Sequence, residues 1–177
     1  MVTRKIIYSL LISTLVSSCG IFRDEIPFDK KALTYKNQFV FDNQFRMDGM
    51  YLRDRGENGY RILYFFQDGY YYADGTLDNI IGTTCFQIYP SARDVPYAWG
   101  CFIVEDSILK VQTFGTVRYQ PFREYKVIER WAEIVNDTTL HFFKTIDHKG
   151  KESGLDETFH FRHCENKPDS TNILMKD

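Results

Sequence analysis

Apolar and polar side chains alternate along most of the chain from Gly49 on, which is the pattern of half-buried β-strands. Turn signals rich in glycine, aspartate and asparagine interrupt this alternation, among them Asn58-Gly59 and Asp68-Gly69. No segment after the first 18 residues repeats apolar positions with the 3.6-residue period of an amphipathic helix. We therefore expect an all-β fold.

The alternating segments define about eight strands, with one long connection between Thr76 and Pro96 that has room for a short strand at residues 85–89. The expected strands cover residues 50–53, 60–67, 70–73, 97–104, 108–114, 122–134, 138–144 and 157–163. An open sheet of this size exposes unpaired backbone groups at both edges, and closure removes those edges. We predict an antiparallel meander closed into an up-and-down barrel. A β-sandwich is the alternative, although its Greek-key crossings need more long connections than the chain contains.

The first 18 residues differ in character from the rest of the chain. Arg4 and Lys5 precede a mostly apolar run from Ile6 to Val16, and two serines follow. This charged, apolar and small-residue order is typical of a secretory signal peptide. The run has 11 residues, whereas a membrane-spanning helix needs about 20, so we expect the leader to be cleaved.

The end of the leader, Val16-Ser17-Ser18-Cys19, resembles the lipobox of bacterial lipoproteins. The resemblance implies that the Cys19 thiol receives a diacylglycerol, that the chain is cut before this residue, and that the new amino terminus is acylated. Two or more acyl chains anchor a protein stably in a membrane. Because Gly20 replaces the aspartate that retains enterobacterial lipoproteins at the inner membrane, the resemblance implies the outer membrane, on either its periplasmic or its surface face. One alternative is a plain secreted protein in which Cys19 forms a disulfide. Another is a cytosolic protein with a buried first helix, against which residues 6–16 show no helical periodicity of polar positions.

Chain length and charge limit the organisation and the partners of the mature protein. Cleavage of residues 1–18 leaves 159 of 177 residues, enough for one domain. We expect a tether at residues 19–45, a barrel at 46–165 and a C-terminal tail at 166–177. Loss of Arg4 and Lys5 leaves 20 basic against 24 acidic residues, a net charge of −4, so nucleic acid is not an expected partner. Aromatic residues make up 16% of the chain, which favours pleated, half-buried surfaces.

Three cysteines remain beyond Cys19, and an exported compartment permits disulfides. At most one bridge forms among Cys85, Cys101 and Cys164 within one molecule. The short loop favours a Cys85–Cys101 bridge, which would stabilise the fold by about 3 kcal/mol in the chain-entropy model. Three buried thiols that pack as small apolar residues are the alternative.

Four short motifs follow one another in the order found in a known family. They are Gly49-x-Tyr51, Tyr-Phe-Phe-x-Asp-Gly at residues 64–69, Trp99-Gly100-x-Phe102-x-Val104, and Ile-Val-Asn-Asp-Thr-Thr-Leu at residues 134–140. Over residues 47–163 this order resembles the bacterial lipocalin-like lipoproteins. The resemblance implies a ligand-sized barrel, with Tyr51 standing where lipocalins carry the Trp of a Gly-x-Trp motif.

No catalytic or phosphate-binding motif occurs in the chain, and we expect neither an enzyme nor a bound cofactor. His160 and His163 lie three positions apart on one expected strand, which directs them to opposite faces of the sheet. A shared metal ion is therefore not expected. The aspartates at positions 68, 74, 106 and 137 fall in expected turns, where backbone geometry accounts for them.

The aromatic residues suggest a site for a small molecule. Tyr60, Ile62, Tyr64 and Phe66 share one face of an expected strand. With Trp99 and Trp131 nearby, they would line an apolar cavity; the alternative is that the same side chains fill the barrel as a dry core. We hypothesise a lipid-anchored envelope protein that binds a small apolar or amphipathic ligand. The alternative is a non-enzymatic interaction module that docks on a membrane or an envelope protein, and a hollow interior of about 300 Å³ or more would distinguish the first from the second.

Overall fold

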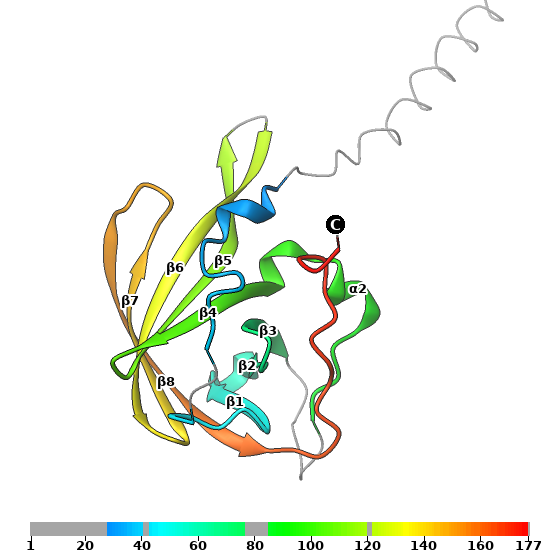
Figure 1. The fold of residues 1–177 in the computed structure, drawn as a ribbon, viewed down its shortest axis with the longest axis vertical. Coiled ribbons are helices and arrows are strands. Elements are labelled where there is room, and N and C mark those ends of the chain that lie inside the picture. The colour runs from blue at the N-terminus through cyan, green and yellow to red at the C-terminus, as the bar shows by residue number, and fades with distance from the viewer. Residues whose placement is uncertain (1–27, 41–42, 77–84, 120–121, 177) are drawn as a thin grey trace, which may run out of the picture.

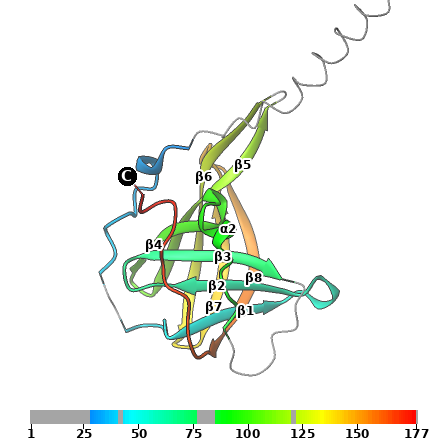
Figure 2. The same cartoon turned by 90° about the vertical axis from the view of Figure 1, so that its right-hand side faces the viewer.

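Eight antiparallel strands form one closed sheet in which each strand pairs with its neighbours in the chain (Figures 1 and 2). The structure is a computed structural model that describes residues 28–40, 43–76, 85–119 and 122–176, so the leader and Cys19 lie outside the described residues. The predicted all-β meander closed into an eight-stranded barrel is confirmed. The strands are β1 (Gly49–Asp54), β2 (Tyr60–Phe65), β3 (Tyr70–Thr76), β4 (Trp99–Glu105), β5 (Ile108–Tyr119), β6 (Phe122–Asn136), β7 (Thr139–Ile146) and β8 (Glu152–His163).

Helical structure in the described residues is limited to short turns, namely η2 (Lys30–Ala32), η3 (Gly56–Asn58), α2 (Pro90–Arg93) and η4 (Pro96–Ala98). Residues 85–89, where the sequence left room for a strand, form none and instead lead into α2. Strands β5 and β6 are longer than expected, and their hairpin extends beyond the end of the barrel (Figure 2).

The turn between β2 and β3 requires glycine at the second position of its Asp68-Gly69 signal. Gly69 adopts a φ of +81°, a conformation open to glycine at no steric cost. A Cβ atom at this position would also lie 2.7 Å from the Cβ of Phe39. Glycine therefore allows both the turn and the close approach of the N-terminal segment.

Side chains that point into the barrel fill one part of its interior. The buried inward-facing residues include Tyr51, Leu63, Phe65, Phe102, Val111, Phe142 and Phe159. Phe45 precedes β1 and caps this part, with its ring centroid 5.2 Å from that of Phe65 in an edge-on contact. The Tyr51 hydroxyl donates a hydrogen bond to the carbonyl of Asp137, 3.0 Å away, which ties the cap to the β6–β7 turn. We call this the closed end of the barrel.

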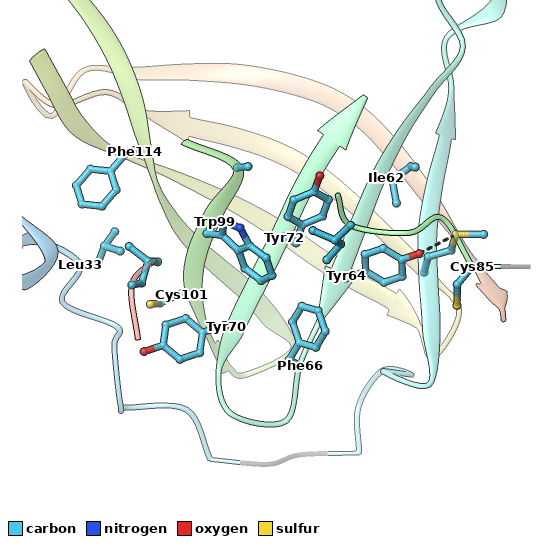
Figure 3. Close-up of a cluster of buried hydrophobic side chains, with 14 of the residues drawn as sticks. Leu33, Ile62, Tyr64, Phe66, Tyr70, Tyr72, Cys85, Trp99, Cys101 and Phe114 are labelled. Carbon is cyan, nitrogen blue, oxygen red and sulfur yellow. Dashed lines mark hydrogen bonds between the residues drawn. The ribbon is translucent and has the colours of Figure 1, made fainter. Parts of the chain in front are cut away.

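The outer face of β2, β3 and β4 is buried as well, and it forms a second hydrophobic core (Figure 3). Trp99 lies at its centre, fully buried, with its ring against those of Phe66 and Tyr72. Residues 85–98 cover this face, and Trp99 Nε1 donates a hydrogen bond to the carbonyl of Ala92 at 3.0 Å. The barrel wall is therefore packed on both sides here, which explains why β2 carries apolar residues on both faces.

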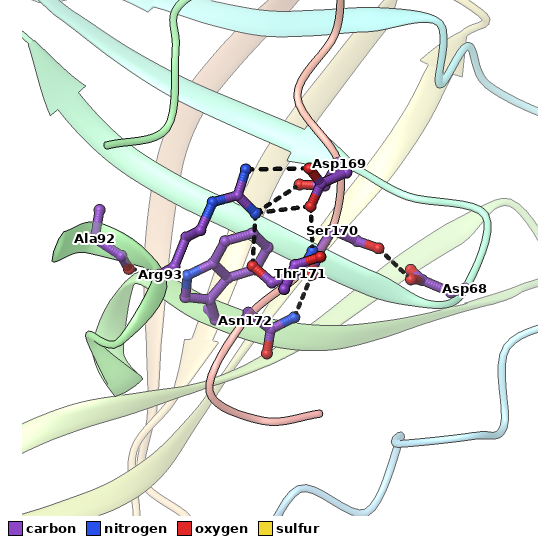
Figure 4. A network of polar contacts seen from close by, with 8 residues as sticks. Asp68, Ala92, Arg93, Asp169, Ser170, Thr171 and Asn172 are labelled. Atoms are coloured by element: carbon purple, nitrogen blue, oxygen red, sulfur yellow. Dashed lines mark hydrogen bonds and ion pairs between the residues drawn. The ribbon is translucent and has the colours of Figure 1, made fainter. Parts of the chain in front are cut away.

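The segment after β8 is part of this second core rather than a free tail. It runs beside α2 (Figure 1), and Leu174 is fully buried. Arg93 forms an ion pair with Asp169 at 2.8 Å and donates a hydrogen bond to the carbonyl of Thr171 at 2.7 Å (Figure 4). Hydrogen bonds from Thr171, followed by the interaction with Arg93, lower the pKa of Asp169 to about 2. This network fixes the C-terminal segment across the covering residues 85–98.

The disulfide joins Cys85 to Cys164, and the predicted Cys85–Cys101 bridge is wrong. Loop length favoured the nearer cysteine, but barrel closure brings the end of β8 beside the covering segment, with the two bridged Cα atoms 5.0 Å apart. Cys101 is a buried free thiol, and burial raises its pKa to about 12. It is therefore unreactive at neutral pH.

We predict that the double variant Cys85→Ala with Cys164→Ala lowers the free energy of unfolding by about 2–4 kcal/mol, because the bridge closes a long loop in the unfolded chain. Urea denaturation followed by circular dichroism measures this difference. The control is Cys101→Ala, which removes only a small buried side chain and is expected to cost about 1 kcal/mol. Equal stability of the double variant and the natural protein would contradict the assignment.

Candidate functional site

A cavity of about 620 Å³ opens at the end of the barrel away from Phe45. The strand directions define this mouth: β1 runs from Tyr51 near Phe45 to Arg53, and β2 runs from Arg61 to Phe65 near Phe45. Arg53 and Arg61 therefore lie towards the opposite end from Phe45, and both line the cavity. We call this region the mouth of the barrel.

Three arginines from different strands converge at the mouth on one carboxylate of β8. Arg53 Nη1 lies 2.5 Å from Glu157 Oε1, while Arg61 Nη1 and Arg130 Nη1 lie 3.9 and 3.7 Å from Glu157 Oε2. Only the first contact has hydrogen-bond length. Glu157 Oε2 is buried and lacks a hydrogen-bond partner among the described residues.

The positive charges of this cluster exceed the negative charge. Three guanidinium groups and one carboxylate leave a net charge of +2. Burial lowers the pKa of Arg61, and the nearby positive charge of Arg130 lowers it further against the attraction of Glu157. A lowered pKa means that the charged form of Arg61 is held in an unfavourable environment. Arg55 and Asp74 also line the cavity and their charges cancel, so the mouth as a whole keeps a net charge of +2.

The floor of the mouth is apolar and tightly packed. Below Arg61 and Arg130, a gap of only about 10 Å³ remains between residues such as Leu63, Val111 and Phe159. Tyr71 is buried there, with its hydroxyl hydrogen-bonded to Thr113, and burial raises its pKa. A ligand at the mouth thus meets arginines at its deepest reachable point rather than a long apolar channel.

A second cavity, of about 660 Å³, lies at the closed end beside the C-terminal segment. Lys167 is its distinctive residue: Nζ donates hydrogen bonds of 2.5 Å to the carbonyls of Met47 and Phe65. Burial lowers the pKa of Lys167 to about 8, against the opposing attraction of Asp48 and Asp68. Because its ammonium is held by backbone carbonyls, Lys167 ties the C-terminal segment to the barrel and is not free to contact a ligand.

The residues predicted to line an apolar ligand cavity do not surround a common space. Ile62, Tyr64, Phe66 and Trp99 belong to the second core on the outer face of the barrel, and Tyr60 shares their face of β2 by alternation. Trp131 lies elsewhere on the outer wall, with its ring between Lys110 and Lys144 at 4.6 and 3.5 Å from the ring centroid. The first four side chains do pack in a core, but that core lies on the outer face, so the alternative that they fill the barrel interior is wrong as well.

The arginines of the mouth were missed because isolated charged residues on a strand usually face solvent. A sequence signal was nevertheless present. Two of the arginines and their partner Glu157 each lie two positions from a buried inward-facing residue and so share its face of the strand. Arg53 follows Tyr51, Arg61 precedes Leu63, and Glu157 precedes Phe159 by this spacing. Three such charges at one level of a barrel indicate a polar interior end.

Other candidate chemistry is not assembled in the described part of the chain. There, no three His, Cys, Asp or Glu side chains are grouped to hold a metal ion. His163 instead lies near Asp48, with Nδ1 3.4 Å from a carboxylate oxygen. Within the same residues, no helix has both the length and the apolar character required to cross a bilayer.

Comparison of the chain with protein-family models, with curated proteins and with solved structures finds no match. The class that fold and site define is an eight-stranded barrel with a basic mouth, and function has to be argued from the site itself.

We predict that Lys167 makes stability rise with pH between about 8 and 10. Its pKa in the folded state is about 8, below the ordinary value of 10.5, so the unfolded chain binds more protons in this range. Raising the pH therefore favours the folded state. Urea denaturation across this range should show the natural protein gaining stability relative to Lys167→Met. The exposed Lys176→Met serves as the control for the loss of one lysine charge at the surface, and a pH-independent difference for Lys167→Met would contradict the burial of its charge.

Proposed function

We propose that this protein is a lipid-anchored envelope lipoprotein whose barrel binds a small amphipathic molecule at its mouth. The observation that carries the proposal is the open cavity of about 620 Å³ that the ends of the strands border. This volume lies within the range of small-molecule sites, about 300–1,000 Å³. A ligand-binding role in a barrel of this size also agrees with the resemblance of the chain to lipocalin-like lipoproteins.

The lining of the mouth supports an amphipathic ligand rather than a purely apolar one. Arg61 and Arg130 supply charge at the inner end, while Ile128 of the β5–β6 hairpin supplies apolar surface further out. A molecule with one charged and one apolar part can satisfy both regions together.

The path of the chain supports a mouth that lies close to the membrane. Phe28, near the start of the described residues, packs against Phe114 and Tyr125 of the β5–β6 hairpin, with ring centroids 5.4 and 6.2 Å away. The nine residues from Cys19 to Phe28 span at most about 32 Å when fully extended. If Cys19 carries the lipid anchor, the cavity is held within reach of the bilayer, where amphipathic molecules are abundant.

The second candidate is an interaction module without a small ligand. Two observations favour it: the barrel interior below the mouth is filled, and Tyr89 and Tyr97 are more than half exposed near the covering segment. Exposed tyrosines are common at protein interfaces. This function predicts that the mouth stays empty when amphipathic molecules are supplied.

We predict that the mature protein, extracted in a mild nonionic detergent, carries or takes up a small amphipathic molecule, visible as added mass in native mass spectrometry. Ala73 faces the mouth and its floor. Ala73→Trp should therefore block the cavity and reduce occupancy at least about tenfold. The matched control is Val135→Trp, at a position that is 53% exposed, which should leave occupancy unchanged. Equal occupancy in both variants would exclude the mouth as the site, and no added mass in any sample would favour the interaction module.

We further predict that Cys19→Ser removes the protein from the membrane fraction or leaves the leader uncleaved, because serine offers no thiol for the lipid. Cell fractionation and intact-mass analysis measure the two outcomes. Cys101→Ser is the control, since this buried thiol lies in β4 and takes no part in anchoring. Unchanged membrane retention and processing of Cys19→Ser would refute the anchor.

A further inference from the structure

We propose that the mouth of the barrel recognises an oxyanion, a carboxylate or a phosphate, which is held between Arg61 and Arg130 and competes with Glu157 for them. The inference rests on the proposed function and names the chemical class of its ligand. The bound molecule is an amphiphile with one anionic head, directed inward, and an apolar tail, directed out along the β5–β6 hairpin.

The first support is the arrangement of like charges in the sheet. Arg53 and Arg61 are direct cross-strand partners on β1 and β2, and both face inward. Like charges in directly opposite positions repel one another across a sheet. Two such arginines are expected to be stable side by side where a negative charge lies between them. In the described residues, Glu157 supplies one negative charge for three arginines.

The second support is that Glu157 lies within hydrogen-bond distance of only one of the three arginines. Its short contact is with Arg53, whereas Arg61 and Arg130 remain 3.9 and 3.7 Å away. These two guanidinium groups come from β2 and β6 and approach the same carboxylate oxygen, Oε2. A ligand oxyanion beside them can accept hydrogen bonds that Glu157 does not accept, and arginine suits carboxylate and phosphate geometry because it donates through a planar fork.

The third support is the low polarity of the surroundings. The floor below the arginines is formed by buried residues such as Leu63 and Phe159 and has no room for a chain of water molecules. Burial and the neighbouring Arg130 both lower the pKa of Arg61, so Glu157 compensates its positive charge poorly. A bound anion supplies the missing compensation, and in such an environment its attraction to arginine is stronger than in water.

The orientation of the ligand follows from the positions of charge and apolar surface. The arginines lie at the inner end of the cavity, and the interior beneath them is filled. An apolar tail therefore has no space further inside. It can lie against Ile128, which lines the part of the cavity nearer the β5–β6 hairpin, so the head enters first.

The test compares 8-carbon molecules with the same tail, namely octanoate, octyl phosphate and uncharged octanol, together with the tailless anions acetate and inorganic phosphate. Isothermal titration calorimetry of the full mature protein in nonionic detergent gives each affinity. We expect octanoate or octyl phosphate to bind at least about tenfold more tightly than octanol. The better of the two identifies the head group as carboxylate or phosphate.

Three variants at the mouth and one control variant test which side chains bind the anionic head. Arg61→Gln and Arg130→Gln should each weaken binding of the anionic amphiphile about 10- to 100-fold, as expected for the loss of a charge-assisted hydrogen bond. Glu157→Gln should strengthen it about threefold or more, because a competing negative charge is removed, a gain that a merely structural role would not produce. Lys144→Gln changes the net charge equally on the outer wall and should have no effect. Octanol affinity and circular dichroism report whether each variant is folded.

Each outcome of these titrations bears on the oxyanion site or on the proposed function. If octanol binds as tightly as the anions and the arginine variants change nothing, the oxyanion site is overturned while ligand binding stands. If tailless anions bind as tightly as octanoate or octyl phosphate, the arginine site stands and the amphiphile is overturned. If the natural protein binds none of the probes, both the inference and the proposed function fail.

Discussion

The pairing of β1 with β8 is the constraint on which the rest of the structure depends. Their antiparallel register places Gly49 opposite His163 and Leu52 opposite His160, and it turns a meander into a closed sheet without edges. Closure of about eight strands leaves an interior just wide enough for side chains. Every inward position must therefore carry either an apolar side chain that packs or a charged side chain with an opposite charge beside it. The closed end of this barrel uses the first solution, and the mouth uses the second.

The fold could be predicted from local signals because strand and turn chemistry agree along the chain. Strand-like segments between turn signals placed each of the eight strands, and Asp68-Gly69 marked a turn in which glycine is required both by its positive φ and by the approach of Phe39. The disulfide could not be predicted in this way. The contact between Cys85 and Cys164 arises only when closure brings the end of β8 to the covering segment, and sequence separation gives no measure of that distance.

The candidate site could not be predicted because alternation separates the two faces of a strand but does not say which face is inside. In β2, Ile62 and Tyr64 point outward and Leu63 and Phe65 point inward, yet all four are buried. The outer pair is buried because residues 85–98 and the C-terminal segment cover it, and these segments carry no strand pattern. Assigning the more aromatic face to the interior led to the wrong ligand cavity and left Arg61 on the solvent side.

The position of Glu157 explains how a basic mouth can remain stable in the absence of a ligand. A site with three uncompensated arginines would repel its own strands, whereas full neutralisation would leave nothing to attract an anion. One carboxylate, bound closely to Arg53 and loosely to Arg61 and Arg130, provides partial compensation. Under the proposed binding mode, an incoming oxyanion gains only the difference between its own contacts and those of Glu157, so we expect its affinity to be moderate. Moderate affinity would suit the proposed lipid-anchored protein, because a molecule taken up from the bilayer could also be released to it.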